Sequence, residues 1–114
     1  MNINKRIMIA DDEPKILQSY KDVFSTKQKT ISYFEEFETS DKYLVQMFID
    51  GDLLLDSFKK HFEEKTRIPL VILDVLMPGM DGITTAKEIR KIDPNVMIIF
   101  ISGAPNLDQE KIRE

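Results

Sequence analysis

The chain has 114 residues, of which 42% are hydrophobic and 32% charged, and its formal net charge at pH 7 is −4. This length fits one domain with a single packed core, and the composition is that of a globular protein rather than a disordered or fibrous one. The negative charge argues against direct nucleic-acid binding. No apolar run approaches the roughly 18 residues of a membrane span. The lack of cysteine excludes disulfides and thiolate metal sites, and it fits a cytoplasmic location.

The first predicted elements are a strand and a helix. Residues 7–10 form a continuous apolar run, which is typical of a strand buried on both faces of a parallel sheet. Pro14 follows, and proline is well tolerated in the first turn of a helix. Apolar residues then recur with helical spacing at Ile16, Leu17, Tyr20, Val23 and Phe24. We therefore predict a helix directly after the first strand.

Residues 25–42 interrupt this pattern with a polar stretch that resembles an insertion. The spacing of Tyr33, Phe34 and Phe37 favours a short packed helix, because a bare loop of this length is uncommon in a compact domain. Two interpretations of residues 25–42 stay open. The stretch either extends the first helix and adds a turn of structure, or it forms a surface on which a partner docks. Residues 43–48 are apolar again and predict a further strand.

Helices and strands alternate through the rest of the chain. Helical spacing recurs at Leu54, Leu55, Phe58 and Phe62, and again at Ile83, Ala86 and Ile89. Strands are predicted at residues 70–73 and 96–101, and residues 107–114 look like the start of a last helix. The alternation predicts one α/β domain, residues 1–114, with a doubly wound parallel sheet. Because the chain stops after so apolar a strand, we expect a C-terminally truncated domain whose exposed sheet edge could pair two copies.

Polar residues gather where the predicted strands end, which is where ligands bind in open α/β sheets. Asp11 and Asp12 follow the first strand, Asp74 ends the strand at 70–73, and Ser102 follows the last strand. Converging carboxylates repel one another unless a cation neutralises them, and Mg²⁺ suits such oxygen ligands. Taken singly, these residues have simpler readings, as a helix cap or a turn residue.

The motifs taken together resemble one family. The run LDVLMPGMDG at residues 73–82, with DDEP at 11–14 and ISGA at 101–104, is similar to the receiver domain of response regulators in two-component signal transduction. The resemblance covers the chain apart from residues 25–42 and implies a flavodoxin-like fold. It implies that Asp74 accepts a phosphoryl group from a sensor histidine kinase or phosphotransfer protein, in order to switch an output. It also implies that Asp11, Asp12, Asp74 and the main-chain carbonyl of Leu76 bind Mg²⁺, and that the Ser102 hydroxyl binds the phosphoryl group.

The resemblance implies a signalling domain rather than an enzyme with turnover, although receivers catalyse their own phosphorylation and dephosphorylation. The family's lysine on a fifth strand is absent from this chain, and Lys111, in the predicted last helix, does not replace it. A phosphorylation-independent interaction module with the same fold is the alternative. A haloacid-dehalogenase-like phosphatase requires Asp-x-Asp after the first strand, which residues 11–13 do not provide, and no glycine-rich turn supports a nucleotide-binding Rossmann domain.

Overall fold

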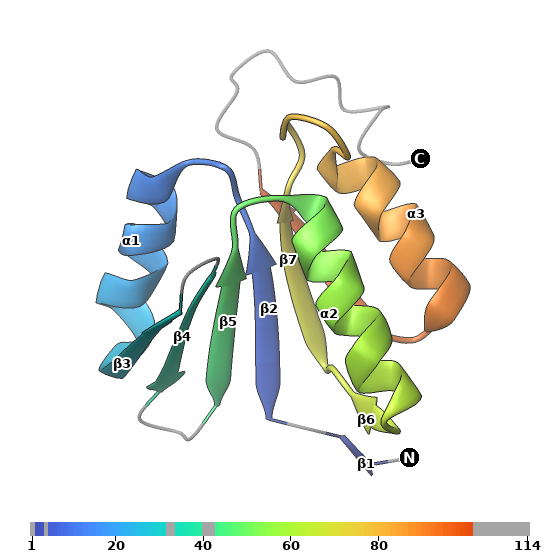
Figure 1. Ribbon diagram of the computed structural model, residues 1–114, viewed down its shortest axis with the longest axis horizontal. Coiled ribbons are helices and arrows are strands. Elements are labelled where there is room, and N and C mark those ends of the chain that lie inside the picture. The colour runs from blue at the N-terminus through green and yellow to red at the C-terminus, as the bar shows by residue number, and fades with distance from the viewer. Residues whose placement is uncertain (1, 4, 32–33, 40–42, 102–114) are drawn as a thin grey trace.

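A six-stranded sheet forms the centre of the protein in the computed structural model, which describes residues 2–3, 5–31, 34–39 and 43–101. The strand order is β3-β4-β5-β2-β7-β8 (Figure 1). Four of these strands run parallel to one another: β2 (Arg6–Ala10), β5 (Leu44–Phe48), β7 (Leu70–Asp74) and β8 (Met97–Ile101). The four strands predicted from apolar runs are therefore confirmed, as is the doubly wound α/β class.

Helices cover both faces of the sheet (Figure 1). Helix α1 (Pro14–Phe24) packs on one face, and α2 (Gly51–Glu63) and α3 (Gly82–Ile92) pack side by side on the other. The first turns of α2 and α3 are capped, because Asp50 and Asp81 each accept a hydrogen bond of 2.8 Å from the backbone N–H three residues later. All three helices confirm the predictions from apolar spacing.

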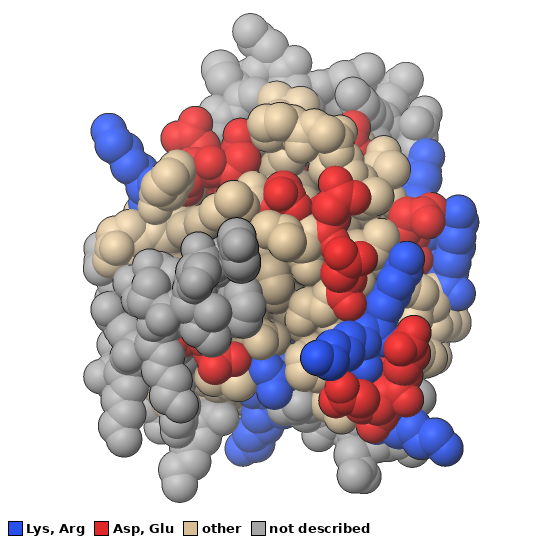
Figure 2. Space-filling view, viewed as in Figure 1, with Lys and Arg blue, Asp and Glu red and all other residues tan. Residues whose placement is uncertain are grey.

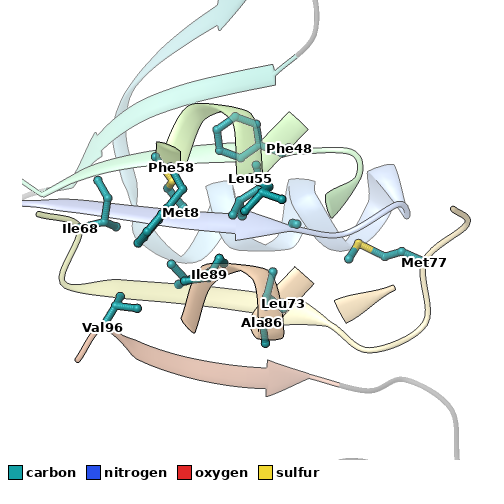
Figure 3. Close-up of a cluster of buried hydrophobic side chains, with 13 residues drawn as sticks. Met8, Phe48, Leu55, Phe58, Ile68, Leu73, Met77, Ala86, Ile89 and Val96 are labelled. Atoms are coloured by element: carbon teal, nitrogen blue, oxygen red, sulfur yellow. The ribbon is translucent and has the colours of Figure 1, made fainter. Parts of the chain in front are cut away.

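The larger hydrophobic core lies between the sheet and the α2–α3 pair (Figure 3). Alternate residues of β2 point to this side, and α2 contributes Phe58, whose side chain is only 1% exposed. The buried members of this cluster are Met8, Ala10, Phe48, Leu54, Leu55, Phe58, Ile68, Val71, Leu73, Met77, Ala86, Ile89 and Val96. A smaller cluster under α1 contains Ile9, Leu17, Val45, Met47 and Ile72. The central strands are thus buried on both faces, as their continuous apolar runs predicted.

The polar stretch after α1 forms a β-hairpin, so the short helix predicted there is wrong. Strands β3 (Ser25–Ile31) and β4 (Phe34–Thr39) are antiparallel, and β4 adds to the edge of β5. The register places Lys27 opposite Glu38 and Lys29 opposite Glu36. The edge of β5 offers backbone hydrogen bonds to β4, whose register runs from Phe34 opposite Phe48 to Glu38 opposite Leu44. These long-range partners outweigh the local aromatic spacing.

Several predictions fall on residues outside the described ranges. These are Ser102, the helix predicted at residues 107–114 and the truncated end of the domain.

Among the described strands, β8 lies at one edge of the sheet, and its Met97 and Ile99 are 62% and 43% exposed. A separate two-stranded parallel pair joins β1 (Asn2–Ile3) to β6 (Thr66–Arg67). Within the described ranges, no helix has the length and apolar character needed to cross a bilayer.

Candidate functional site

Three aspartates meet at the carboxyl edge of the sheet. Asp11 and Asp12 follow β2, Asp74 ends β7, and these strands are direct neighbours with Ala10 paired to Leu73. One carboxylate oxygen from each aspartate lies within 4.8 Å of the others. The Asp11 side chain is buried, with 4% exposure, whereas Asp12 and Asp74 are half-buried. Figure 2 shows acidic side chains gathered above the ends of the central strands.

Backbone hydrogen bonds fix this cluster in place. The Asp11 N–H donates to the carbonyl of Phe48 at 3.0 Å, which ties the end of β2 to the end of β5. The Glu13 N–H donates to Asp11 Oδ1 at 2.9 Å, and the Leu76 N–H donates to Asp74 Oδ1 at 3.4 Å. Backbone N–H groups in the loops after the strands therefore orient the carboxylates of Asp11 and Asp74, so the fold sets the positions of these side chains.

Two carboxyl groups of the cluster, those of Asp74 and Asp11, are harder to ionise than usual. Burial, followed by the charge of Asp11, raises the pKa of Asp74 from 3.8 to about 6, although the Leu76 N–H works in the opposite direction. Burial likewise raises the pKa of Asp11, partly offset by the hydrogen bond from Glu13. Asp12 adds a further negative charge that raises the pKa of both groups.

The donor set fits a small, hard divalent cation. Mg²⁺ binds oxygen ligands at about 2.1 Å, so two oxygens on one ion lie at most about 4.2 Å apart. The separation of up to 4.8 Å found here requires only a small rotation of the side chains. A divalent charge at this point would also relieve the repulsion that raises the pKa of Asp74. The geometry and the electrostatics of the three aspartates are therefore both compatible with Mg²⁺.

Gly82 allows α3 to begin against the acidic cluster. A Cβ atom at this position would overlap the carbonyl oxygen of Asp74 and lie 3.0 Å from the Cα of Val75. The Gly82 N–H donates to the Val75 carbonyl at 3.0 Å, which closes the loop between β7 and α3. Close backbone approach, rather than an unusual dihedral angle, is thus the reason for glycine here.

The structure brings together Asp11, Asp12 and Asp74, as the sequence predicted. The Leu76 N–H donates a hydrogen bond to Asp74 Oδ1. The role of the Leu76 carbonyl as a metal ligand stays a prediction. Ser102 lies outside the described residues. Sequence reasoning missed Tyr20, which was counted only as an apolar residue of α1. Its phenol is close enough to the cluster that burial, together with the charges of Asp11 and Asp74, raises its pKa. The sequence signal was a residue with a polar end on an otherwise apolar helix face.

Comparison with known families identifies the domain. The family model described as "Response regulator receiver domain" matches residues 7–113. The chain belongs to the response regulator receiver domain family. The fold agrees: a receiver domain protein (CheY-like) from Methanospirillum hungatei superposes with a TM-score of 0.69 at 22% identity, over 96% of this chain and 71% of the other. A two component transcriptional regulator AraC from Clostridium phytofermentans gives a TM-score of 0.65 at 28% identity, over 96% and 73%.

Curated relatives of this receiver domain include both short and long proteins. Sporulation initiation phosphotransferase F of Bacillus subtilis is 29% identical over 106 residues, which cover 93% of this chain and 70% of the relative. Chemotaxis protein CheY of the same organism is 31% identical over 98 residues, covering 86% and 67%. Response regulator GtcR of Aneurinibacillus migulanus is 27% identical over 110 residues, and there the match spans only 37% of the relative.

Proposed function

We propose that this receiver domain accepts a phosphoryl group on Asp74 from a phosphohistidine of a sensor histidine kinase or phosphotransfer protein, and thereby switches an output. The observation that carries the proposal is the convergence of Asp11, Asp12 and Asp74 within 4.8 Å at the carboxyl edge of the sheet. A structural cap or turn requires one carboxylate, whereas three close together, with the pKa of Asp11 and Asp74 raised, are unfavourable without a cation or a chemical role.

In the proposed transfer, a carboxylate oxygen of Asp74 attacks the phosphorus atom of the phosphohistidine. The new P–O bond forms as the P–N bond breaks, and the imidazole nitrogen leaves with the bonding electron pair and takes up a proton. The product on Asp74 is an acyl phosphate. With a pKa of about 6, Asp74 is mostly ionised at pH 7.5 even without metal, as a nucleophile requires.

The surrounding residues have proposed roles in positioning and charge neutralisation. Asp11, Asp12, Asp74 and the Leu76 carbonyl would hold Mg²⁺, whose charge would stabilise the phosphoryl oxygens in the loose transition state. The Leu76 N–H, now on Asp74 Oδ1, orients that carboxylate. The Ser102 hydroxyl would donate to a phosphoryl oxygen after transfer. Because the domain itself becomes modified, it is a phospho-acceptor and not an enzyme with external turnover.

The test is intact-mass analysis after incubation with Mg²⁺ and acetyl phosphate. Wild-type protein, Asp74→Asn and the matched variant Asp52→Asn are compared, because Asp52 lies in the exposed first turn of α2 outside the cluster. We expect one labile phosphoryl adduct on wild type and on Asp52→Asn. The Asp74→Asn variant should carry none, and chelation of Mg²⁺ should abolish the adduct on the other two.

An adduct that persists in Asp74→Asn would refute the assignment of the acceptor. Wild-type protein that binds Mg²⁺ but forms no adduct with acetyl phosphate or phosphoramidate would favour the alternative, a phosphorylation-independent interaction module.

Pairing of two copies through the outer edge of β8 is a separate proposal about partners. A monodisperse monomer in light scattering would contradict it. We place the domain in the cytoplasm, where sensor kinases present their phosphohistidines.

A further inference from the structure

The face of the sheet under α1 leads from Tyr20 to the acidic cluster. Tyr20 is half-buried and packs on the smaller hydrophobic cluster, whose buried members include Ile9 and Ile72. Side chains alternate between the two faces of a strand. Asp11 lies two residues beyond Ile9 and therefore emerges on the same face as this cluster. Asp74, two residues beyond Ile72 at the end of β7, does the same.

Helix α1 directs the Tyr20 side chain towards these aspartates. The helix begins at Pro14, at the carboxyl edge of the sheet, and runs back towards the amino edge (Figure 1). Tyr20 comes six residues after Pro14, about 9 Å along the helix axis. Side chains on a helix tilt towards its N-terminus, so that of Tyr20 leans back to the carboxyl edge.

The length of the side chain suits this position. Two residues of a strand rise about 6.6 Å, which is close to the length of a tyrosine side chain. A ring that packs on Ile9 and Ile72 can therefore place its hydroxyl level with the carboxylates of Asp11 and Asp74. The apolar part of Tyr20 thus belongs to the core, and its polar end belongs to the site.

The pKa of Tyr20 agrees with this placement. Burial, followed by the charges of Asp11 and Asp74, raises the pKa of the phenol above its ordinary value of 10.0. Charges act strongly on a group only over short distances, so these carboxylates are neighbours of the phenol. At neutral pH the hydroxyl keeps its proton and can donate a hydrogen bond.

A phosphoryl group on Asp74 would need such a donor. It brings up to two negative charges and three acceptor oxygens into the site. The charges that act on Asp74 in the folded chain come from Asp11 and Asp12, and both are negative. The Leu76 N–H approaches Asp74 from the loop after β7, whereas Tyr20 approaches from the side of α1.

We propose that the Tyr20 hydroxyl donates a hydrogen bond to a phosphoryl oxygen of phosphorylated Asp74, which makes Tyr20 a phosphoryl-binding residue. This inference rests on the proposed function of Asp74 and adds a contact that joins the modified side chain to α1. The hydrogen bond forms only when the phosphoryl group arrives, so Tyr20 supports phosphorylation and not the binding of Mg²⁺. Phosphorylation is thereby linked to the helix that leads directly into the β3–β4 hairpin.

The test is a time course of intact mass with Mg²⁺ and acetyl phosphate for wild type, Tyr20→Phe and Tyr43→Phe. Phenylalanine keeps the ring of Tyr20 on the apolar cluster and removes only the hydroxyl. Tyr43 is the matched control, because it is 36% exposed and precedes β5 at the amino edge of the sheet. Tyr20→Phe should lower the rate constant of adduct formation about tenfold, as expected for loss of a hydrogen bond to a charged group. Tyr43→Phe should match wild type.

Two further measurements separate a contact with the phosphoryl group from a structural role of the ring. The affinity for Mg²⁺ alone, measured by calorimetry, should be the same in wild type and Tyr20→Phe. In protein labelled with ¹³C-tyrosine, the ring resonance that disappears in Tyr20→Phe should shift when beryllium trifluoride, a stable mimic of a phosphoryl group, is added to the Mg²⁺-bound protein. The Tyr43 resonance should stay in place.

Three results would overturn the proposal, and they differ in what they leave standing. A wild-type rate in Tyr20→Phe would refute the contact and leave Asp74 as the acceptor. A loss of Mg²⁺ affinity as large as the loss of phosphorylation would assign the hydroxyl to the metal cluster instead. Wild-type protein that binds Mg²⁺ but forms no adduct would refute the proposed function itself, and the role of Tyr20 with it.

Discussion

Replacement of Asp74 by asparagine should stabilise the metal-free protein. Asparagine has the same shape and keeps an oxygen that accepts the hydrogen bond from the Leu76 N–H, but it removes one of three crowded negative charges. The pKa of Asp74 is about 6 in the folded protein and 3.8 for the ordinary group, so folding opposes its ionisation. Wild-type protein incurs this cost at neutral pH, and the variant does not.

The size of the effect follows from the shift in pKa. A difference of about 2 pH units corresponds to at most about 3 kcal/mol, and solvent screening at this half-buried group reduces the expected gain to about 1 kcal/mol. Because the folded pKa is raised, the group's contribution to stability is fully present below pH 3.8 and is lost as the pH rises through about 6. The advantage of Asp74→Asn should therefore be complete above pH 7 and shrink towards pH 4.5.

Urea denaturation of both proteins at several pH values, with and without Mg²⁺, measures this directly. At pH 7.5 with a chelator, the variant should have the higher free energy of unfolding. Added Mg²⁺ should stabilise wild type more than the variant, because it neutralises the charges that the mutation removes. A variant that is less stable than wild type at pH 7.5 without metal, or a difference independent of pH, would show that the three carboxylates do not repel one another as argued.

Three further substitutions test the architecture around the site by the same urea denaturation. Gly82→Ala should cost about 1–3 kcal/mol, because its Cβ would overlap the Asp74 carbonyl, whereas the exposed neighbour Thr84→Ala should change stability by less than about 0.5 kcal/mol. Phe58→Ala should cost about 3–5 kcal/mol, since this fully buried ring fills the core under α2, and a smaller loss would mean that the core collapses around the gap. Asp81→Ala removes the N-cap of α3 and should cost about 1 kcal/mol; no loss would indicate that the hydrogen bond to the Thr84 N–H is replaced by water.

The local pattern of the sequence was sufficient to predict most of the helices and strands and the position of the candidate site. Apolar runs marked β2, β5, β7 and β8, and helical spacing marked α1, α2 and α3. Because parallel strands end at one edge of a sheet, the sequence alone predicts that Asp11, Asp12 and Asp74 meet. These features depend on interactions between residues close in the chain, or on a topology in which strands and helices alternate.

Tertiary structure alone decided the hairpin and the electrostatics. Strands β3 and β4 form because β5 offers an edge to which β4 pairs, and this edge is not visible in the local spacing of aromatic residues. The raised pKa of Asp74, the approach of Tyr20 to the aspartates and the burial of Glu36 against Arg6 likewise depend on distances between residues remote in sequence. Burial and Coulomb interactions act through space, so the sequence names the charged groups but only the folded chain sets how strongly they interact.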